Sequence, residues 1–195
     1  MLAERARVWA TWWLHHVARG CMRLGITPNL LTLVSFAAVA GVGGVIALGH
    51  FRLAGVLLLL TAWFDAVDGT LARMSGRVSP FGAFLDATLD RYAEIFLYLG
   101  LLVYYTRYFD TYAIYLIYFT IVGSLLISYT RAKAESVGIP VREGFLTRFE
   151  RMAILVLGLL FDRTEFALWL LAPLTHITAV QRMVVVWMRS REDTR

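Results

Sequence analysis

Residues 65–73 read Asp65-Ala66-Val67-Asp68-Gly69-Thr70-Leu71-Ala72-Arg73, and after eight further residues come Gly82, Asp86 and Asp90. The flanking sequence is apolar enough to cross a membrane, where an unpaired carboxylate is so unfavourable that it indicates a functional site. Four acidic groups close together also repel one another, and metal cations or a bound cationic group must offset that repulsion. Ion pairs with Arg73, Arg77 or Arg91 would explain one aspartate, but four at this spacing favour function.

The composition indicates an integral membrane protein. Of the 195 residues, 59% are hydrophobic, whereas a soluble domain is typically about 45–50% apolar. The single cysteine, Cys21, excludes an intramolecular disulfide and a thiolate metal site. The formal charge is +5, and all but one of the 19 basic residues are arginine. In a membrane protein this excess predicts contact with anionic lipid or phosphate, and the sequence has no nucleic-acid motif.

The N-terminal residues 1–24 are predicted to form an amphipathic helix in the membrane interface. Apolar residues recur at helical spacing on one face, and arginines lie largely elsewhere. The apolar face comprises Leu2, Ala6, Trp9, Trp13 and Val17. A signal peptide is the competing interpretation, but charges interrupt the apolar run and no small-residue cleavage site follows it.

Six transmembrane helices are predicted to follow this segment. Thr27 can cap the first of them, with Pro28 at the first helical position. The expected ranges are 30–49, 53–75, 82–106, 111–135, 147–161 and 166–189. Only 30–49 and 111–130 are uncharged and close to the ~20 residues that a span requires. Each of the other apolar runs becomes long enough only if its polar flank is drawn into the membrane.

The basic residues predict how these helices are oriented. The loops at 50–52, 107–110 and 162–165 carry one arginine each, and the other sixteen basic residues fall on the opposite side. By the positive-inside rule that side faces the cytosol. We therefore expect an all-α, multi-pass protein of the cytoplasmic membrane, whose polar cavity opens to the cytosol.

The whole chain, 1–195, is expected to form one domain, with the helix bundle over 25–190 and a tail over 191–195. A transporter or a lipid-binding scaffold is the non-enzyme alternative. A transporter needs polar groups along a full path. Here every intramembrane charge lies at the inner ends of the helices, which argues against transport.

The spacing of the acidic motif suits a metal site. Asp65 and Asp68 share one face of a helix, and Asp86 and Asp90 share one face of the next. Two antiparallel neighbours can point all four carboxylates into one space. Oxygen ligands alone suit Mg²⁺, Mn²⁺ or Ca²⁺ rather than Zn²⁺. Four carboxylates are enough for two cations, the arrangement that clamps phosphoryl oxygens.

The residues between the aspartates suit a phosphate ligand. Gly69, Ala72 and Gly82 have little or no side chain, so a phosphate can approach the backbone, and Arg73 is placed to bind its oxygens. As the pattern D-x2-D-G-x2-A-R-x8-G-x3-D-x3-D, residues 65–90 resemble the CDP-alcohol phosphatidyltransferases. The six-helix layout with an amphipathic start is also similar to that family.

This resemblance implies a reaction and a role for each residue of the motif. An alcohol hydroxyl would attack the β-phosphorus of a CDP-diacylglycerol-type lipid and release CMP, with two Mg²⁺ or Mn²⁺ ions as cofactors. All four aspartates would hold the metals, and Asp90 would also act as general base on the hydroxyl. The CDP-lipid site would comprise Asn29, Thr32, Asp65, Asp68, Gly69, Ala72, Arg73 and Gly82.

A second polar cluster bears on the acceptor alcohol. Arg131, Arg151 and Arg182 lie near the expected inner ends of three helices and could converge on a phosphate. Membrane anchoring or pairing with Glu150 is the alternative, and anchoring suffices for arginines such as Arg189. Arg182 interrupts an apolar run, however, which favours function because an intramembrane charge is unfavourable.

The segments around these arginines resemble those of the bacterial phosphatidylinositol phosphate synthases. The resemblance implies a pocket for the phosphate of inositol phosphate, formed by Ser128, Arg131, Arg151 and Arg182. Arg131 stands where that subfamily usually has lysine, which keeps the charge but changes the shape. Archaeal-type inositol phosphate enzymes are equally compatible. Glycerol-3-phosphate, the acceptor of phosphatidylglycerol phosphate synthases, is the alternative because it also carries a phosphate.

Two further expectations concern helix packing. Gly41, Gly43 and Gly44 would permit close helix contacts, including a contact in a homodimer. His176 is a lone histidine between apolar residues, and we expect it to be a hydrogen-bonded interior group rather than a ligand.

Overall fold

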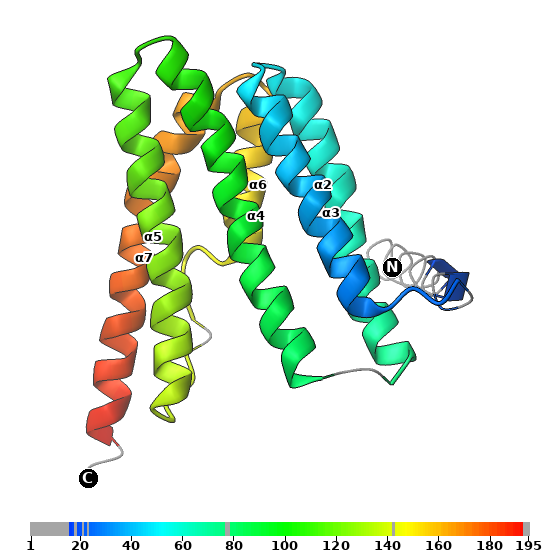
Figure 1. Ribbon diagram of the computed structural model, residues 1–195. Helices are drawn as coiled ribbons and strands as arrows, with labels where there is room; N and C mark the ends of the chain where they lie inside the picture. Colours follow the sequence, from blue (N-terminus) through cyan, green and yellow to red (C-terminus); the bar gives the residue numbers. More distant parts are fainter. Residues whose placement is uncertain are drawn as a thin grey trace, which may run out of the picture. The chain divides into compact units, whose positions relative to one another are not determined.

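The computed structural model is all-α (Figure 1) and describes residues 16, 17, 19, 20, 22, 24–76, 79–141 and 143–192, with the side chains of 63–66, 68, 69, 72 and 192 left out of the description. Its helices are α2 (Pro28–Ala47), α3 (Phe51–Met74), α4 (Pro80–Arg107), α5 (Thr111–Ser136), α6 (Arg148–Leu160) and α7 (Thr164–Glu192). The six predicted helices of this part are confirmed, each end within three residues of its expected place. The interfacial helix over 1–24 falls largely outside the described residues and stays a prediction.

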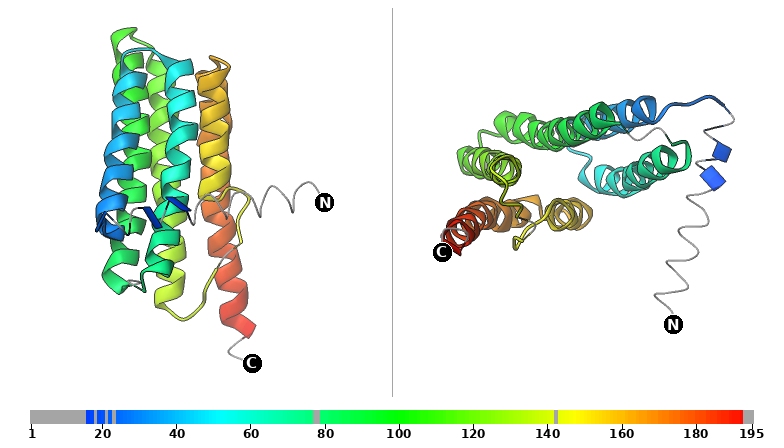
Figure 2. Two further views of the ribbon diagram at one scale, coloured as in Figure 1. Left: turned by 90° about the vertical axis from the view of Figure 1, so that its right-hand side faces the viewer. Right: turned by 90° about the horizontal axis from the view of Figure 1, so that it is seen from below.

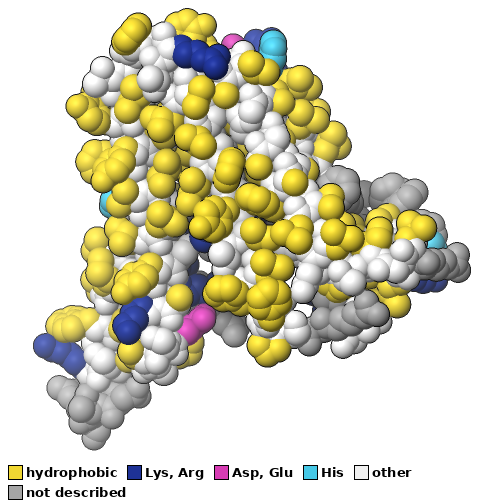
Figure 3. Space-filling view, viewed as in Figure 1, with side chains coloured by type: hydrophobic (Ala, Val, Ile, Leu, Met, Phe, Trp, Pro, Cys, Tyr) yellow, Lys and Arg dark blue, Asp and Glu magenta, His cyan; other side chains and the backbone are white. Residues whose placement is uncertain are grey.

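Three of the described helices are long and apolar enough to cross a membrane by themselves. They are α2, α5 and α7 as far as Arg191, and α3 adds a shorter apolar stretch over Phe51–Ala62. This agrees with the expectation that the other helices are long enough to cross the membrane only if the polar residues at their ends are included. Large apolar side chains also remain exposed along α5, as lipid contact would require (Figure 3). The chain is therefore a membrane protein.

The backbone contacts divide the chain into two compact units, which are described separately. The first comprises Met1–Gly44 and Val56–Leu97, and the second comprises Val45–Gly55 and Tyr98–Arg195. The acidic motif belongs to the first unit and the three arginines belong to the second. The expectation of a single domain over 1–195 stays a prediction.

In the first unit, α2 packs against both α3 and α4. Leu31 of α2 forms a buried cluster with Val67 and Leu71 of α3. On its other side, a Cβ added at Gly43 would overlap the carbonyl oxygen of Phe96 on α4. The close packing predicted for the glycines is thus confirmed at Gly43. The helix itself begins as expected, since the Leu30 N–H donates to Thr27 Oγ1 over 3.3 Å.

In the second unit, α7 packs along α5 and also against α6, as the views in Figures 1 and 2 show. The approach of α5 to α7 depends on Gly123, where an added Cβ would overlap the Thr175 side chain. Next to this contact, His176 Nε2 lies 3.0 Å from the Phe119 carbonyl oxygen, which confirms the expected hydrogen bond, but the residue is half-buried rather than interior.

The start of α6 is fixed by a capping box. Thr147 is its N-cap, and Glu150 accepts a hydrogen bond from the Thr147 N–H over 2.8 Å. Glu150 therefore helps to end the segment that leads from α5 to α6, and the charge of Arg151 also acts on its carboxylate. This places Arg151 in the first turn of α6.

Candidate active site

The acidic motif occupies two helices of the first unit. α3 runs without interruption through positions 65, 68 and 72, so these positions share a face of the helix. The buried residues Val67 and Leu71 lie on a different face, which is the one turned to α2. The backbone of α3 therefore has the geometry that the predicted metal-binding stripe needs.

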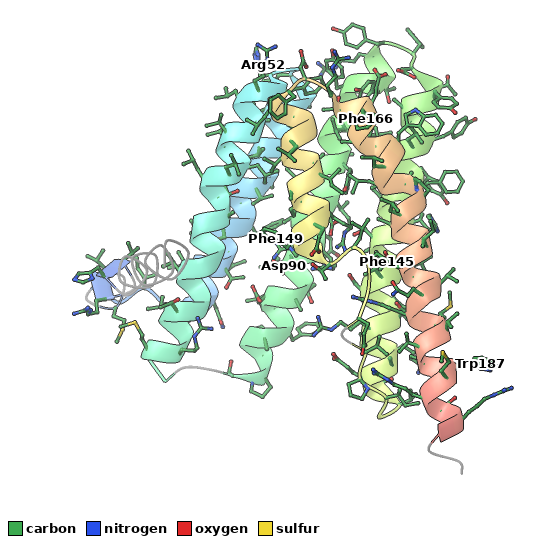
Figure 4. The ribbon with its side chains drawn as sticks, turned by 180° about the vertical axis from the view of Figure 1, so that it is seen from behind. Arg52, Asp90, Phe145, Phe149, Phe166 and Trp187 are labelled. Atoms are coloured by element: carbon green, nitrogen blue, oxygen red, sulfur yellow. The ribbon has the colours of Figure 1, made fainter. Side chains whose placement is uncertain are left out.

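On α4, Gly82, Asp86 and Asp90 follow one another at four-residue steps, as expected. Asp86 is exposed, and the Asp90 side chain is 19% exposed with its carboxylate 3.7 Å from Arg91 Nη2. Figure 4 shows Asp90 on this helix. Both carboxylates are therefore accessible to a cation or a polar substrate.

The donor set fits a divalent cation, since it consists of carboxylate oxygens carried on helices of one unit. Within the described part of the chain, no group of three or more His, Cys, Asp or Glu side chains gathers closely enough to hold a metal. The side chains of Asp65 and Asp68 are not among those described. The site of four carboxylates thus stays a prediction.

Two residues predicted for the nucleotide site meet where α2 and α4 begin. The Gly82 N–H donates to Ser79 Oγ over 3.0 Å. A Cβ added at Gly82 would lie 3.1 Å from Ser79 Oγ and 3.2 Å from Asn29 Oδ1, which is tighter than ordinary contact. The structure therefore brings the Asn29 amide against Gly82, where a larger residue would require the amide to shift by a few tenths of an ångström.

The other described members of the predicted nucleotide site make local contacts. Thr32 Oγ1 donates to the Pro28 carbonyl oxygen over 3.1 Å. Arg73 is exposed, and its Nη2 donates weakly to Thr70 Oγ1 over 3.4 Å. The Arg73 guanidinium is thus free to reach an anion, whereas the Thr32 hydroxyl is turned to its own helix.

The predicted acceptor arginines come together in the second unit. Arg151 and Arg182 are only 1% and 4% exposed. Arg131 is exposed and pairs with Glu135 one turn later over 3.1 Å. The positive charges of Arg131 and Arg151 and the negative charge of Glu143 all act on the Arg182 guanidinium, so these side chains lie within electrostatic range of it. Three positive groups from α5, α6 and α7 therefore share one region.

The buried arginines are held by backbone carbonyl groups, which the sequence did not reveal. Arg182 Nε donates to the Glu143 carbonyl oxygen over 3.1 Å, and its Nη1 donates to the Ile127 carbonyl oxygen over 2.6 Å. Arg151 Nη1 donates to the Leu146 carbonyl oxygen over 3.4 Å. Ser128, one turn before Arg131, donates to the Ser124 carbonyl oxygen over 3.2 Å.

Known proteins resemble this chain over most of its length. Residues 25–188 match the family model of the CDP-alcohol phosphatidyltransferases. The archaetidylinositol phosphate synthase of Pyrococcus horikoshii is 34% identical over 171 residues, which cover 87% of this chain and 88% of the relative. The phosphatidylinositol phosphate synthase of Corynebacterium glutamicum is 38% identical over 181 residues, covering 87% and 81%.

Solved structures show the same fold. The Mycobacterium tuberculosis phosphatidylinositol phosphate synthase with CDP-DAG bound superposes with a TM-score of 0.85 at 31% identity, covering 89% of this chain and 93% of that one. The structure of the same synthase in complex with manganese and citrate also gives 0.85, at 30% identity, covering 89% and 88%.

Proposed function

The chain belongs to the CDP-alcohol phosphatidyltransferase family of enzymes, and from this premise we propose that it transfers a phosphatidyl or archaetidyl-type group from a CDP-linked lipid to inositol phosphate. The hydroxyl oxygen of the acceptor attacks the β-phosphorus of the lipid. The bond from that phosphorus to the oxygen bridging the two phosphates breaks, and CMP leaves with the electron pair.

The observation that carries the choice of acceptor is the group of arginines in the second unit. The hydrogen bonds that Arg182 makes in the described part of the chain go to two carbonyl oxygens, which carry no full charge. The Glu143 carboxylate already acts on this guanidinium, but two other arginines also lie near it, so a further anion would stabilise the group. A phosphate on the acceptor supplies that anion, whereas free inositol or serine does not. The relatives named as inositol phosphate synthases support this choice.

Asp90 is the proposed general base. Its carboxylate accepts the proton of the attacking hydroxyl, and the partial exposure of its side chain supports access by the acceptor. Arg91, whose Nη2 lies 3.7 Å from this carboxylate, adds a positive charge beside it.

The same four aspartates, Asp65, Asp68, Asp86 and Asp90, are proposed to hold two divalent cations, Mg²⁺ or Mn²⁺. Bound there, the cations would supply positive charge for the diphosphate oxygens. The relative solved in complex with manganese supports a metal in this family. Asn29, Thr32, Gly69, Ala72, Arg73 and Gly82 would line the CDP site, and the contact of Asn29 with Gly82 supports this grouping.

The location of the protein is proposed from its charge distribution. Sixteen of the basic residues fall on one expected side of the membrane. We therefore propose that this side of the cytoplasmic membrane, with the active site, faces the cytosol.

A homodimer is also proposed. Gly41 and Gly44 support it because both are exposed and have no side chain or backbone within 4 Å of an added Cβ in the described part of the chain.

An acceptor panel tests the proposed function. Purified full-length protein would receive CDP-diacylglycerol with inositol phosphate, glycerol-3-phosphate, free inositol or serine, and CMP release would be measured. We expect inositol phosphate to give the highest kcat/KM, and free inositol to give little turnover because it lacks the phosphate. A preference for glycerol-3-phosphate would show that it, and not inositol phosphate, is the acceptor. A preference for an uncharged alcohol would contradict the proposed role of the arginines.

A further inference from the structure

One face of α7 binds the backbone of the segment that connects α5 to α6. Leu146 N–H donates to Thr178 Oγ1 over 3.2 Å, and Phe145 N–H donates to Gln181 Oε1 over 3.1 Å. Arg182 Nε donates to the Glu143 carbonyl oxygen over 3.1 Å. Figure 4 shows Phe145 on this connecting segment, residues 137–141 and 143–147.

A further bond at the end of α7 extends the same set of contacts. Arg189 Nη1 donates to the Pro140 carbonyl oxygen over 2.6 Å, and its Nη2 pairs with the Glu143 carboxylate. Arg189, which membrane anchoring alone could have explained, therefore contributes to holding the connecting segment. Four side chains of α7 thus form hydrogen bonds with backbone groups of the connecting segment, which lie outside the helices.

The contact is tight at Gly144 of the segment. A Cβ added at Gly144 would lie 3.0 Å from Thr178 Cγ2 and 3.2 Å from Arg182 Nε. The neighbouring Leu146 is buried, and its N–H to Thr178 is a buried hydrogen bond. The segment is therefore held closely against α7 at the level of Arg182.

The connecting segment also binds both buried arginines through its carbonyl groups. The Glu143 carbonyl oxygen accepts from Arg182, and the Leu146 carbonyl oxygen accepts from Arg151. Leu146 is thus bonded on one side to Thr178 and on the other to Arg151. A shift of this backbone would move the acceptors that orient the two guanidinium groups.

We propose that Thr178 and Gln181 are positioning residues for the phosphate of the acceptor. They do not touch the acceptor; they hold the backbone of residues 143–146, which in turn orients Arg151 and Arg182. The inference rests on the proposed function, because it assumes that these arginines bind the acceptor phosphate. It adds that the specificity of the site depends on neutral side chains outside both the acidic motif and the arginine set.

Paired substitutions test this role. Thr178→Val and Gln181→Leu each remove the oxygen that accepts a backbone N–H, whereas Thr178→Ser keeps it. We expect Thr178→Val to raise the KM for inositol phosphate about tenfold, because it leaves the buried Leu146 N–H without its acceptor. Gln181→Leu should raise this KM less, because the bond from the Phe145 N–H to Gln181 is exposed. The KM for CDP-diacylglycerol and kcat should stay within about twofold of the wild-type values. Thr178→Ser should have the acceptor KM of the wild type.

Thr120→Val is the matched control. Thr120 is also a buried threonine of the second unit, but its Oγ1 donates to the Leu116 carbonyl oxygen of its own helix. It should leave the acceptor KM unchanged. The positioning role is overturned if Thr178→Val and Gln181→Leu change neither KM. It is also overturned if they change kcat and both KM values to the same extent as Thr120→Val does.

Inorganic phosphate separates this inference from the proposed function. Its binding to detergent-solubilised full-length protein can be measured by calorimetry without any turnover. We expect wild type to bind phosphate and Thr178→Val to bind it more weakly. If inositol phosphate gives no turnover but this difference remains, the proposed acceptor fails and the positioning role stands. If wild type turns over inositol phosphate and phosphate binding is the same in both proteins, the positioning role fails alone.

Discussion

The two units of this enzyme carry their chemistry in different ways. In the first unit the acidic groups lie within 26 consecutive residues, 65–90, and helical spacing alone groups them. In the second unit the arginines come from α5, α6 and α7, and Arg182 is held by backbone carbonyl groups 39 and 55 residues away in the sequence. The proposed metal site thus depends on local spacing, whereas the proposed acceptor site depends on tertiary packing. Substitutions in the first unit should change turnover, and those in the second should change acceptor binding.

Removal of divalent cations should have the largest effect. With excess chelator we expect CMP release to fall to background with every acceptor, because the diphosphate charge is no longer offset. Adding back Mg²⁺ or Mn²⁺ should restore it, and the ion that restores the higher kcat is the preferred cofactor. Turnover that persists in excess chelator would contradict the proposed role of all four aspartates.

Asp90→Asn should have the next largest effect. Asparagine keeps the size but cannot accept the hydroxyl proton, so kcat should fall by roughly 10²–10⁴-fold. Binding of CDP-diacylglycerol, measured by calorimetry, should be largely preserved.

Asp162→Asn is the matched control for this substitution. Asp162 is an exposed carboxylate between α6 and α7, at a backbone φ of 58° that asparagine also tolerates. It should leave kcat unchanged. Near-normal turnover of Asp90→Asn would remove the general-base assignment.

The fold and the acidic motif could be predicted because their signals are local. The start of α2 follows from Thr27 and Pro28, and the six helix ranges follow from apolar runs and their polar flanks. The contact of Asn29 with Gly82 could not be predicted, since it depends on how α2 meets α4.

The environment of Arg182 could not be predicted for the same reason. Its carbonyl partners, Glu143 and Ile127, lie 39 and 55 residues away in the sequence. The neighbouring Gln181 was the only local sign, because it is a second polar residue interrupting the same apolar run. A glutamine alone does not indicate which backbone group it binds.

Arg182→Ala should have an intermediate effect that belongs to the second unit. The loss of a buried charged donor should raise the KM for inositol phosphate by roughly 10–100-fold. The KM for CDP-diacylglycerol should rise much less. Steady-state kinetics with each substrate varied in turn measures the two values.

The matched control is Arg191→Ala, on the same helix. Arg191 is exposed and lies 4.1 Å over the Trp187 ring, so its charge has a partner outside the acceptor site. It should change neither KM. Equal increases in both KM values for Arg182→Ala would show that this arginine does not distinguish the acceptor from the lipid.

Gly82→Ala should have the smallest effect, and it separates stability from binding in the first unit. Alanine favours a helix over glycine by about 1 kcal/mol, so the thermal stability should not fall. The added Cβ nevertheless meets Asn29 Oδ1 at 3.2 Å, and the amide must move by a few tenths of an ångström. If Asn29 binds the nucleotide, the KM for CDP-diacylglycerol should rise about two- to tenfold while the acceptor KM stays constant. Gly20→Ala, at an exposed helical position of the same unit with no described atom within 4 Å of the added Cβ, should leave both values unchanged. An unchanged lipid KM in Gly82→Ala would exclude Asn29 from the nucleotide site, and a raised acceptor KM would contradict the division of roles between the two units.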